Sequence, residues 1–176
     1  MHSVGPFSIL SLEAKDAYSL NALILDNMDN FASYLPITVS QNLTVKASEA
    51  YIQKKKEENH SKTTLTFALK DIASQKIAGL VIVKNINLQK KEAEFAYCLG
   101  STYSGNGWMT KAIEKITEIT HQQLDIQLFK IITHKTNISS CRVAEKNGFI
   151  WKKTLLKAFK PKGVAPMDME LYERTL

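Results

Sequence analysis

Hydrophobic residues along the chain follow two spacings, one of every third or fourth residue and one of every second. The first spacing is typical of amphipathic helices and the second of half-buried strands. Four stretches carry the helical spacing: residues 13–31, 48–59, 107–123 and 138–146. Seven stretches predict strands: residues 7–12, 64–69, 76–83, 93–99, 128–133, 149–159 and 164–172.

The order of these elements predicts one mixed sheet with helices on both faces, an α/β (α+β) architecture of about seven strands. Residues 77–83 are apolar at successive positions, so this strand should be covered on both sides. Residues 85–91 and 160–163 are predicted turns, the second with proline and glycine where a type I turn takes them. We find no linker, repeat or low-complexity tract in the sequence, so residues 1–176 should form a single domain.

Composition narrows the class of protein. The hydrophobic fraction of 44% is ordinary for a globular chain, and no apolar run approaches the roughly 20 residues of a membrane span. The first residues lack the charged and apolar regions of a signal peptide. Cys98 and Cys141 lie inside predicted elements and show no metal-type spacing, so we expect reduced thiols, no metal site and a cytoplasmic location.

The net charge of +6 and the pI of about 9.2 favour anionic partners in general. The densest basic run, at residues 54–56, is followed at once by two glutamates, which is typical of a solvated helix face. No recognised nucleic-acid motif accompanies it, so we expect neither a nucleic acid nor a membrane as partner.

The stretch with the clearest chemistry joins the strand at residues 93–99 to the helix that begins after Gly107. Gly105-Asn106-Gly107 lies between them, and glycine allows a backbone to approach a bulky phosphate closely. The first N–H groups of a helix have no partner within the helix, and the helix dipole adds positive potential there. We therefore predict that backbone N–H groups from Ser104 to Thr110 bind a phosphate-bearing ligand.

Two motifs resemble one known family. Tyr97-Cys98-Leu99-Gly100 with Gly105-Asn106-Gly107-Trp108 resembles the acetyl-CoA loop of the GNAT N-acetyltransferases. About thirty residues later, Asn137-Ile138-Ser139-Ser140 and Glu145-Lys146-Asn147-Gly148-Phe149 resemble the signature of the RimJ/RimL-type branch, named for enzymes that acetylate ribosomal-protein N-termini. The resemblance covers nearly the whole chain.

The resemblance implies acetyl-CoA as cosubstrate. It implies a bulge in residues 94–99 that splays this fourth strand from the fifth, at 128–133, so that the pantetheine arm can pair with the exposed backbone. A backbone N–H there would polarise the thioester carbonyl. Asn137, which also suits a helix N-cap, would hydrogen-bond to pantetheine or substrate. The expected cofactor-binding residues are Tyr97, Cys98, Leu99, Ser104, Gly105, Asn106, Gly107, Trp108, Met109, Thr110 and Asn137.

Two residues are candidates for proton transfer. Alternation places Glu94 beside the small Ala96 and Cys98, and family members often use a carboxylate here as general base; the alternative is a solvent-facing strand residue. Ser140 lies one turn after Asn137 and would stabilise or protonate the thiolate leaving group; the alternative is a capping-turn serine. His134 is a reserve acid or base.

The resemblance implies direct transfer of an acetyl group to a primary amine, in which the cysteines serve packing. The favoured acceptor is a protein or peptide N-terminal α-amino group, with a polyamine or aminoglycoside-like amine as the enzymatic alternative. Thr102 and Lys111 depart from the family pattern and suggest a rival class, a non-catalytic acyl-CoA-binding or nucleic-acid-binding protein. Residues 31–43 should shape the acceptor pocket, and the chain should be a monomer or homodimer.

Overall fold

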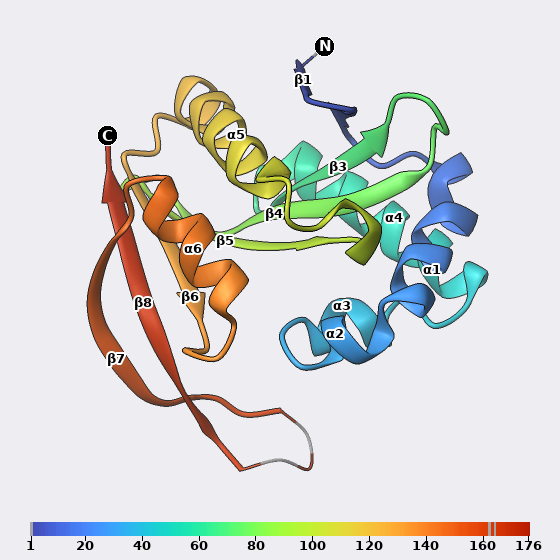
Figure 1. Ribbon diagram of the computed structural model, residues 1–176. Coiled ribbons are helices and arrows are strands. Elements are labelled where there is room, and N and C mark those ends of the chain that lie inside the picture. Colours follow the sequence, from blue (N-terminus) through green and yellow to red (C-terminus); the bar gives the residue numbers. More distant parts are fainter. Residues whose placement is uncertain (1, 162, 164) are drawn as a thin grey trace.

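A computed structural model describes residues 2–161, 163 and 165–176. Its eight strands form one mixed sheet in the order β1-β2-β3-β4-β5-β6-β8-β7 (Figure 1). The strands are β1 His2–Val4, β2 Phe7–Leu10, β3 Leu65–Asp71, β4 Ile77–Asn87, β5 Glu92–Leu99, β6 Leu128–Thr133, β7 Ile150–Phe159 and β8 Met167–Thr175. The helices are α1 Ala17–Asp26, α2 Met28–Ala32, α3 Pro36–Ser40, α4 Val45–Ser61, α5 Trp108–Leu124 and α6 Ile138–Lys146. The mixed architecture with helices on both faces is thus confirmed.

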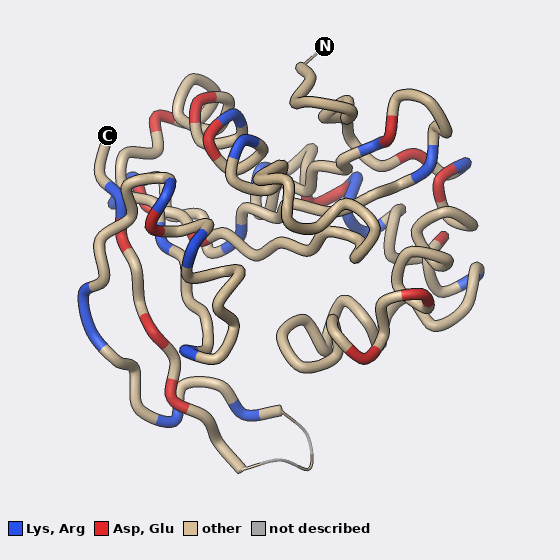
Figure 2. The backbone as a smooth tube through the Cα atoms, in the orientation of Figure 1, with Lys and Arg blue, Asp and Glu red and all other residues tan. Residues whose placement is uncertain are grey.

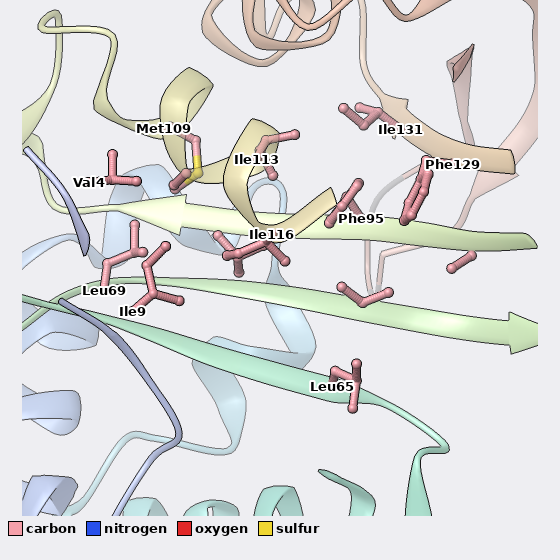
Figure 3. Packing of buried hydrophobic residues seen from close by; sticks show 14 of the residues in the cluster. Val4, Ile9, Leu65, Leu69, Phe95, Met109, Ile113, Ile116, Phe129 and Ile131 are labelled. Atoms are coloured by element: carbon pink, nitrogen blue, oxygen red, sulfur yellow. The ribbon is translucent and has the colours of Figure 1, made fainter. Parts of the chain in front are cut away.

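Each face of the sheet carries its own hydrophobic core. Helix α5 packs Met109, Ile113 and Ile116 against the strands on one face, beside Phe95 and Phe129 (Figure 3). On the other face, α1 to α4 contribute Leu20, Ile24 and Phe31, among others, to a cluster that includes Leu80 and Cys98 of the sheet. The continuous apolar run of β4 is explained by this double cover.

The N-terminal third differs from the prediction in detail. The helix predicted over residues 13–31 is a 3₁₀ turn followed by α1 and α2, because Asn27 breaks the helix with a φ of −124°. Its amide donates to the Leu23 carbonyl at 2.8 Å and accepts from the Ser101 N–H at 2.9 Å, which ties the corner to the loop after β5. Helix α3, with Pro36 at its first turn, and the three-residue β1 were missed because both are too short to show a period.

The turns between strands also differ from those predicted. Strand β4 continues to Asn87, through residues predicted as turn, because Asn85 takes a left-handed φ of 52° and the register with β5 shifts between Lys84 and Asn87. This irregularity replaces the bulge expected in residues 94–99, whose pairing with β4 is continuous from Glu94 to Leu99. The predicted turn at 160–163 and the start of the strand predicted at 164–172 include residues 162 and 164, which lie outside the described residues.

Strands β5 and β6 separate partway along their length. They pair in parallel from Glu92 with Leu128 to Phe95 with Ile131. Beyond that point β5 continues to Leu99 against β4, while β6 continues to Thr133 against β8. The two strands therefore diverge, as predicted. They are the fourth and fifth strands of the prediction, which did not include β1.

A buried ion pair anchors the start of α1 to the sheet. Lys70 of β3 lies 2.6 Å from the Asp16 carboxylate, with side chains only 5% and 4% exposed. The second Asp16 oxygen accepts from the Glu13 N–H at 3.0 Å, so both oxygens are satisfied. Both charges are removed from water, so the pair depends on its mutual contact.

Removing one member of this pair should destabilise the fold strongly. We expect Lys70→Ala to lower the free energy of unfolding by about 3–5 kcal/mol, because the Asp16 charge would stay buried without a partner. Urea denaturation followed by circular dichroism measures the change. Lys15→Ala, which breaks the exposed pair of Lys15 and Glu13, is the control and should barely move the midpoint. An equally small effect of Lys70→Ala would contradict the anchoring role.

Candidate active site

The divergence of β5 and β6 opens into a cavity of about 620 Å³, which we call the main cavity. Its walls come from the ends of both strands, the first turn of α5, one face of α6, the α2 region and the β7–β8 hairpin. Twelve of the thirteen site residues predicted from the sequence line it: Glu94, Tyr97, Cys98, Leu99, Ser104, Gly105, Gly107, Trp108, Met109, Thr110, Asn137 and Ser140. Asn106, itself a described residue, is not among the lining residues; its amide donates to the Ser104 carbonyl at 3.3 Å.

The glycine loop gives the main cavity an anion-binding end. Gly105 and Gly107 have φ values of 85° and 72°, a left-handed backbone that glycine adopts without strain. A Cβ built at either position would meet no described heavy atom within 4 Å, so the space over the loop is open. Gly107 caps α5, and the Lys111 N–H makes the first helical bond to its carbonyl at 3.2 Å. The preceding N–H groups of the helix are therefore available to a ligand.

Two cations on α6 line the same cavity and were not identified from the sequence. Arg142 and Lys146 lie two and six residues after Ser140, and both are exposed. Their helix is held to the start of α5, because the Asn147 amide donates to the Thr110 carbonyl at 3.2 Å. The charges reinforce the positive potential of the α5 N-terminus.

Glu94 enters the main cavity from β5 with both carboxylate oxygens engaged. Its side chain is 13% exposed, and one oxygen lies 2.9 Å from the Lys84 ammonium, directly opposite on β4. The other oxygen accepts from the Asn85 amide at 2.9 Å. The left-handed Asn85 allows two consecutive residues of β4 to serve one carboxylate, so the bulge in β4 orients this side chain.

Ser140 is buried in the first turn of α6 and pairs with Tyr97 across the gap between the diverging strands. The two hydroxyl oxygens lie 2.8 Å apart. Burial raises the pKa of the Tyr97 phenol, and the hydrogen bond with Ser140 opposes that rise, so the phenol stays protonated. The Asn137 side chain accepts from the Ser140 N–H at 3.3 Å, which makes Asn137 the N-cap of α6.

The two remaining candidates, His134 and Cys98, are defined by their hydrogen bonds and burial. His134 lines the main cavity, with its ring nitrogen 2.7 Å from the Thr136 hydroxyl. Cys98 lies in the core beneath the α1 side, where burial raises the pKa of its thiol to about 12 despite a backbone hydrogen bond involving Leu80. A protonated thiol is a poor nucleophile, which agrees with a packing role for Cys98.

The side of the main cavity opposite the glycine loop is largely apolar. Phe31, Tyr34 and Leu35 line it, within the segment 31–43 predicted to shape an acceptor pocket. The β7–β8 hairpin supplies a second wall that no sequence signal indicated, made of Leu155, Ala158, Phe159, Met167 and Met169. Unbranched methionines let such a wall adapt to different ligands.

Comparison with known proteins identifies the class to which this fold and site belong. Residues 9–150 match the family model described as Acetyltransferase (GNAT) domain. A curated relative, the probable N-acetyltransferase YjcK of Bacillus subtilis (strain 168), is 25% identical over 154 residues, which cover 87% of this chain and 85% of the relative.

Solved structures agree with this match. The Microcin C7 self immunity acetyltransferase MccE, crystallised with acetyl-CoA and AMP, is similar with a TM-score of 0.87 and 28% identity over 97% of this chain and 93% of that one. RimL, a ribosomal L7/L12 α-N-protein acetyltransferase in complex with coenzyme A, shares the fold with a TM-score of 0.90 at 18% identity, over 99% and 97% of the two chains. The chain belongs to the GNAT acetyltransferase family. It is an acetyl-CoA-dependent N-acetyltransferase.

The residues present fit this cosubstrate. Acetyl-CoA carries phosphates, and the open glycine loop at the positive end of α5 offers backbone N–H donors for them. The predicted set of donors loses Ser104, whose N–H already donates to the Ser101 carbonyl at 3.1 Å. Past the point where β5 and β6 part, backbone groups of β5 on the β6 side are free to pair with an extended arm. Lys111, one of the departures from the family pattern, places its ammonium 4.9 Å from the Trp108 ring centroid.

A side chain at Gly107 should interfere with the cosubstrate. We expect Gly107→Val to raise the dissociation constant of acetyl-CoA by about tenfold or more, because the new side chain would occupy the open space over the loop. Isothermal titration measures the affinity. Gly163→Val has the same left-handed backbone and open surroundings but lies outside the cavity lining, so it controls for strain. Equal affinities in the two variants would argue against phosphate binding at Gly107.

The raised pKa of Cys98 predicts slow alkylation of the native protein. At pH 8 we expect its thiolate fraction to be about a thousandth of that of an ordinary cysteine, and to grow only as the pH approaches 12. A time course with iodoacetamide, read by mass spectrometry of the peptides, tests this. In urea, where burial is lost, Cys98 should be labelled readily. Rapid labelling of native Cys98 at pH 8 would refute the prediction.

Proposed function

We propose that this acetyltransferase transfers the acetyl group of acetyl-CoA to the N-terminal α-amino group of a protein or peptide. One observation carries the proposal: the glycine loop of α5, the Glu94 carboxylate and the Ser140 hydroxyl line a single cavity. A phosphate-bearing cosubstrate, a proton acceptor and a proton donor can therefore meet there. The names of the structural neighbours that act on ribosomal proteins support the choice of acceptor.

Glu94 is the proposed general base. An ammonium has no lone pair with which to attack a thioester, so a proton must first leave it, directly to Glu94 or through a water molecule. Lys84 and Asn85 hold the carboxylate in place at 2.9 Å each, and their contacts reduce the side-chain freedom that would otherwise be lost on binding. Lys84 and Asn85 are positioning residues in this proposal.

Ser140 is the proposed proton donor to the leaving thiolate. Its hydroxyl can give up a proton and regain one from the Tyr97 phenol, 2.8 Å away, which burial keeps protonated. Backbone N–H groups of β5 beyond Phe95 would polarise the thioester carbonyl as an oxyanion hole does. The acetyl group then passes directly to the amine, and the Cys98 thiol takes no part.

A specific observation weighs against a polycationic acceptor such as a polyamine or an aminoglycoside-like amine. Among the described residues that line the main cavity, Glu94 is the only carboxylate, whereas Lys84, Arg142 and Lys146 are cations. Lys84 already neutralises Glu94 at 2.9 Å. A ligand with several positive charges would meet repulsion without compensating contacts, whereas a monoamine with an apolar neighbour suits the apolar acceptor wall.

The function is tested by supplying acetyl-CoA with a panel of acceptors. The panel contains peptides with a free N-terminus, the same peptides with a blocked N-terminus and a free lysine, spermidine and an aminoglycoside. We expect thiol release only with the free α-amino group, and mass spectrometry should place the acetyl group there. Preferential acetylation of lysine side chains, spermidine or the aminoglycoside would overturn the proposed acceptor.

Glu94→Gln tests the mechanism on the peptide that proves active. We expect kcat to fall by about a hundredfold or more at neutral pH, the contribution of a general base, with the affinity for acetyl-CoA unchanged. Glu118→Gln is the matched control, since Glu118 is also ion-paired, with Lys115 at 2.7 Å, but lies far along α5 outside the cavity lining. An unaltered kcat in Glu94→Gln would remove Glu94 as the base.

A further inference from the structure

A second groove, of about 690 Å³, lies on the sheet face that α1 to α4 leave open beside β6, β8 and β7; we call it the sheet groove. Its apolar lining residues are Ala93, Ile132, Leu155 and Leu171. It follows β5 back toward Glu92, away from the end that leads into the glycine loop. Apart from Glu94 and Asn85, its lining residues take no part in the proposed proton transfer.

The sheet groove is continuous with the main cavity. Glu94, Ile132 and Leu155 line both. Glu94 therefore stands at the junction, where the proposed base would meet the reactive amine. A small amine would occupy only the main cavity, whereas an extended polypeptide, at about 3.3 Å per residue, would continue along the groove.

The charges of the sheet groove favour an acidic segment. Of its carboxylates, Glu94 is paired with Lys84, and Glu92 with Lys130 at 2.8 Å. Lys152 and Lys153 of β7 line the groove, are exposed, and form no ion pair with any residue that the structure describes. Figure 2 shows this basic stretch of β7 along the edge of the molecule. Glu173 is the remaining carboxylate of the lining.

We propose that the sheet groove binds the residues that follow the N-terminus of a polypeptide acceptor, and that Lys152 and Lys153 contact an acidic side chain among them. The inference rests on the proposed function, because it needs the α-amino group to lie at Glu94. It adds that the enzyme recognises a stretch of the acceptor chain in addition to its first residue. The acceptor is thus an acidic N-terminal segment of a protein.

The first experiment varies the length and charge of the acceptor. Starting from an amino-acid amide and ending with an octapeptide, kcat/KM should rise with length and then level off. At full length, a peptide with glutamates at positions three to five should exceed its lysine counterpart by about fivefold, a ratio expected for two exposed ion pairs. High salt should erase that ratio, because it screens exposed charges.

The second experiment reverses the charge of the groove. In K152E/K153E the preference should invert, with KM for the glutamate peptide raised and KM for the lysine peptide lowered, while kcat and the rate with the amino-acid amide stay unchanged. K46E/K56E, two exposed lysines of α4 outside both cavities, makes the same charge change and should leave the preference intact. Thermal melts of both variants establish that they fold.

The outcomes separate the two proposals. If no free N-terminus is acetylated at any length, the proposed function fails. If short and long acceptors are equivalent, or if K152E/K153E affects acidic and basic peptides alike, the sheet groove is not the peptide site and the proposed function stands. An inverted preference confined to the longer peptides supports the inference.

Discussion

The limited pairing of β5 with β6 is the constraint on which the site depends. Where the pairing ends, Phe95 stacks on Phe129 with ring centroids 5.4 Å apart, and Phe149 meets Phe95 edge-on at 6.4 Å. This aromatic cluster fills the base of the wedge, so the two strands can diverge above it without opening the core to water. Backbone groups that a continuous sheet would use internally are thereby left for a ligand.

Several polar contacts keep the surroundings of this wedge in place. Tyr97 and Ser140 bridge the gap through their hydroxyls, which ties α6 to β5. On the acceptor side, the buried Asn42 accepts from the Ser48 hydroxyl at 2.7 Å and donates to the Thr38 carbonyl at 2.8 Å. Its own carbonyl accepts from the Asn21 amide at 2.8 Å. This network joins α1, α3 and α4, so the wall beside α2 rests on a satisfied polar core.

Much of the fold and of the site could be predicted from local pattern. The glycine loop, the cap at Asn137 and the alternation that places Glu94 depend on residues close together in the sequence, so spacing reveals them. The contacts of Lys84 and Asn85 with Glu94 could not be predicted in this way, because they depend on the register of β4 against β5 and on a left-handed backbone at Asn85.

Features that depend on the order of strands in the sheet could not be predicted from the sequence either. The hairpin wall reaches the main cavity because β8 inserts between β6 and β7 in the sheet. The alternation of polar and apolar residues over 149–172 does not show whether β7 or β8 lies next to β6. At the break of the first helix, Asn27 likewise contacts Ser101, a partner seventy-four residues away that no local pattern reveals.

The state of Cys98 bears on the fidelity of acyl transfer. A cavity that holds a reactive thioester exposes its own walls to acylation, and a cysteine in the wall is the first side chain at risk. Burial keeps this thiol protonated, with a pKa of about 12, so Cys98 lines the cavity without acting as a nucleophile. The same desolvation that packs the core therefore protects Cys98 from acylation by a thioester bound beside it.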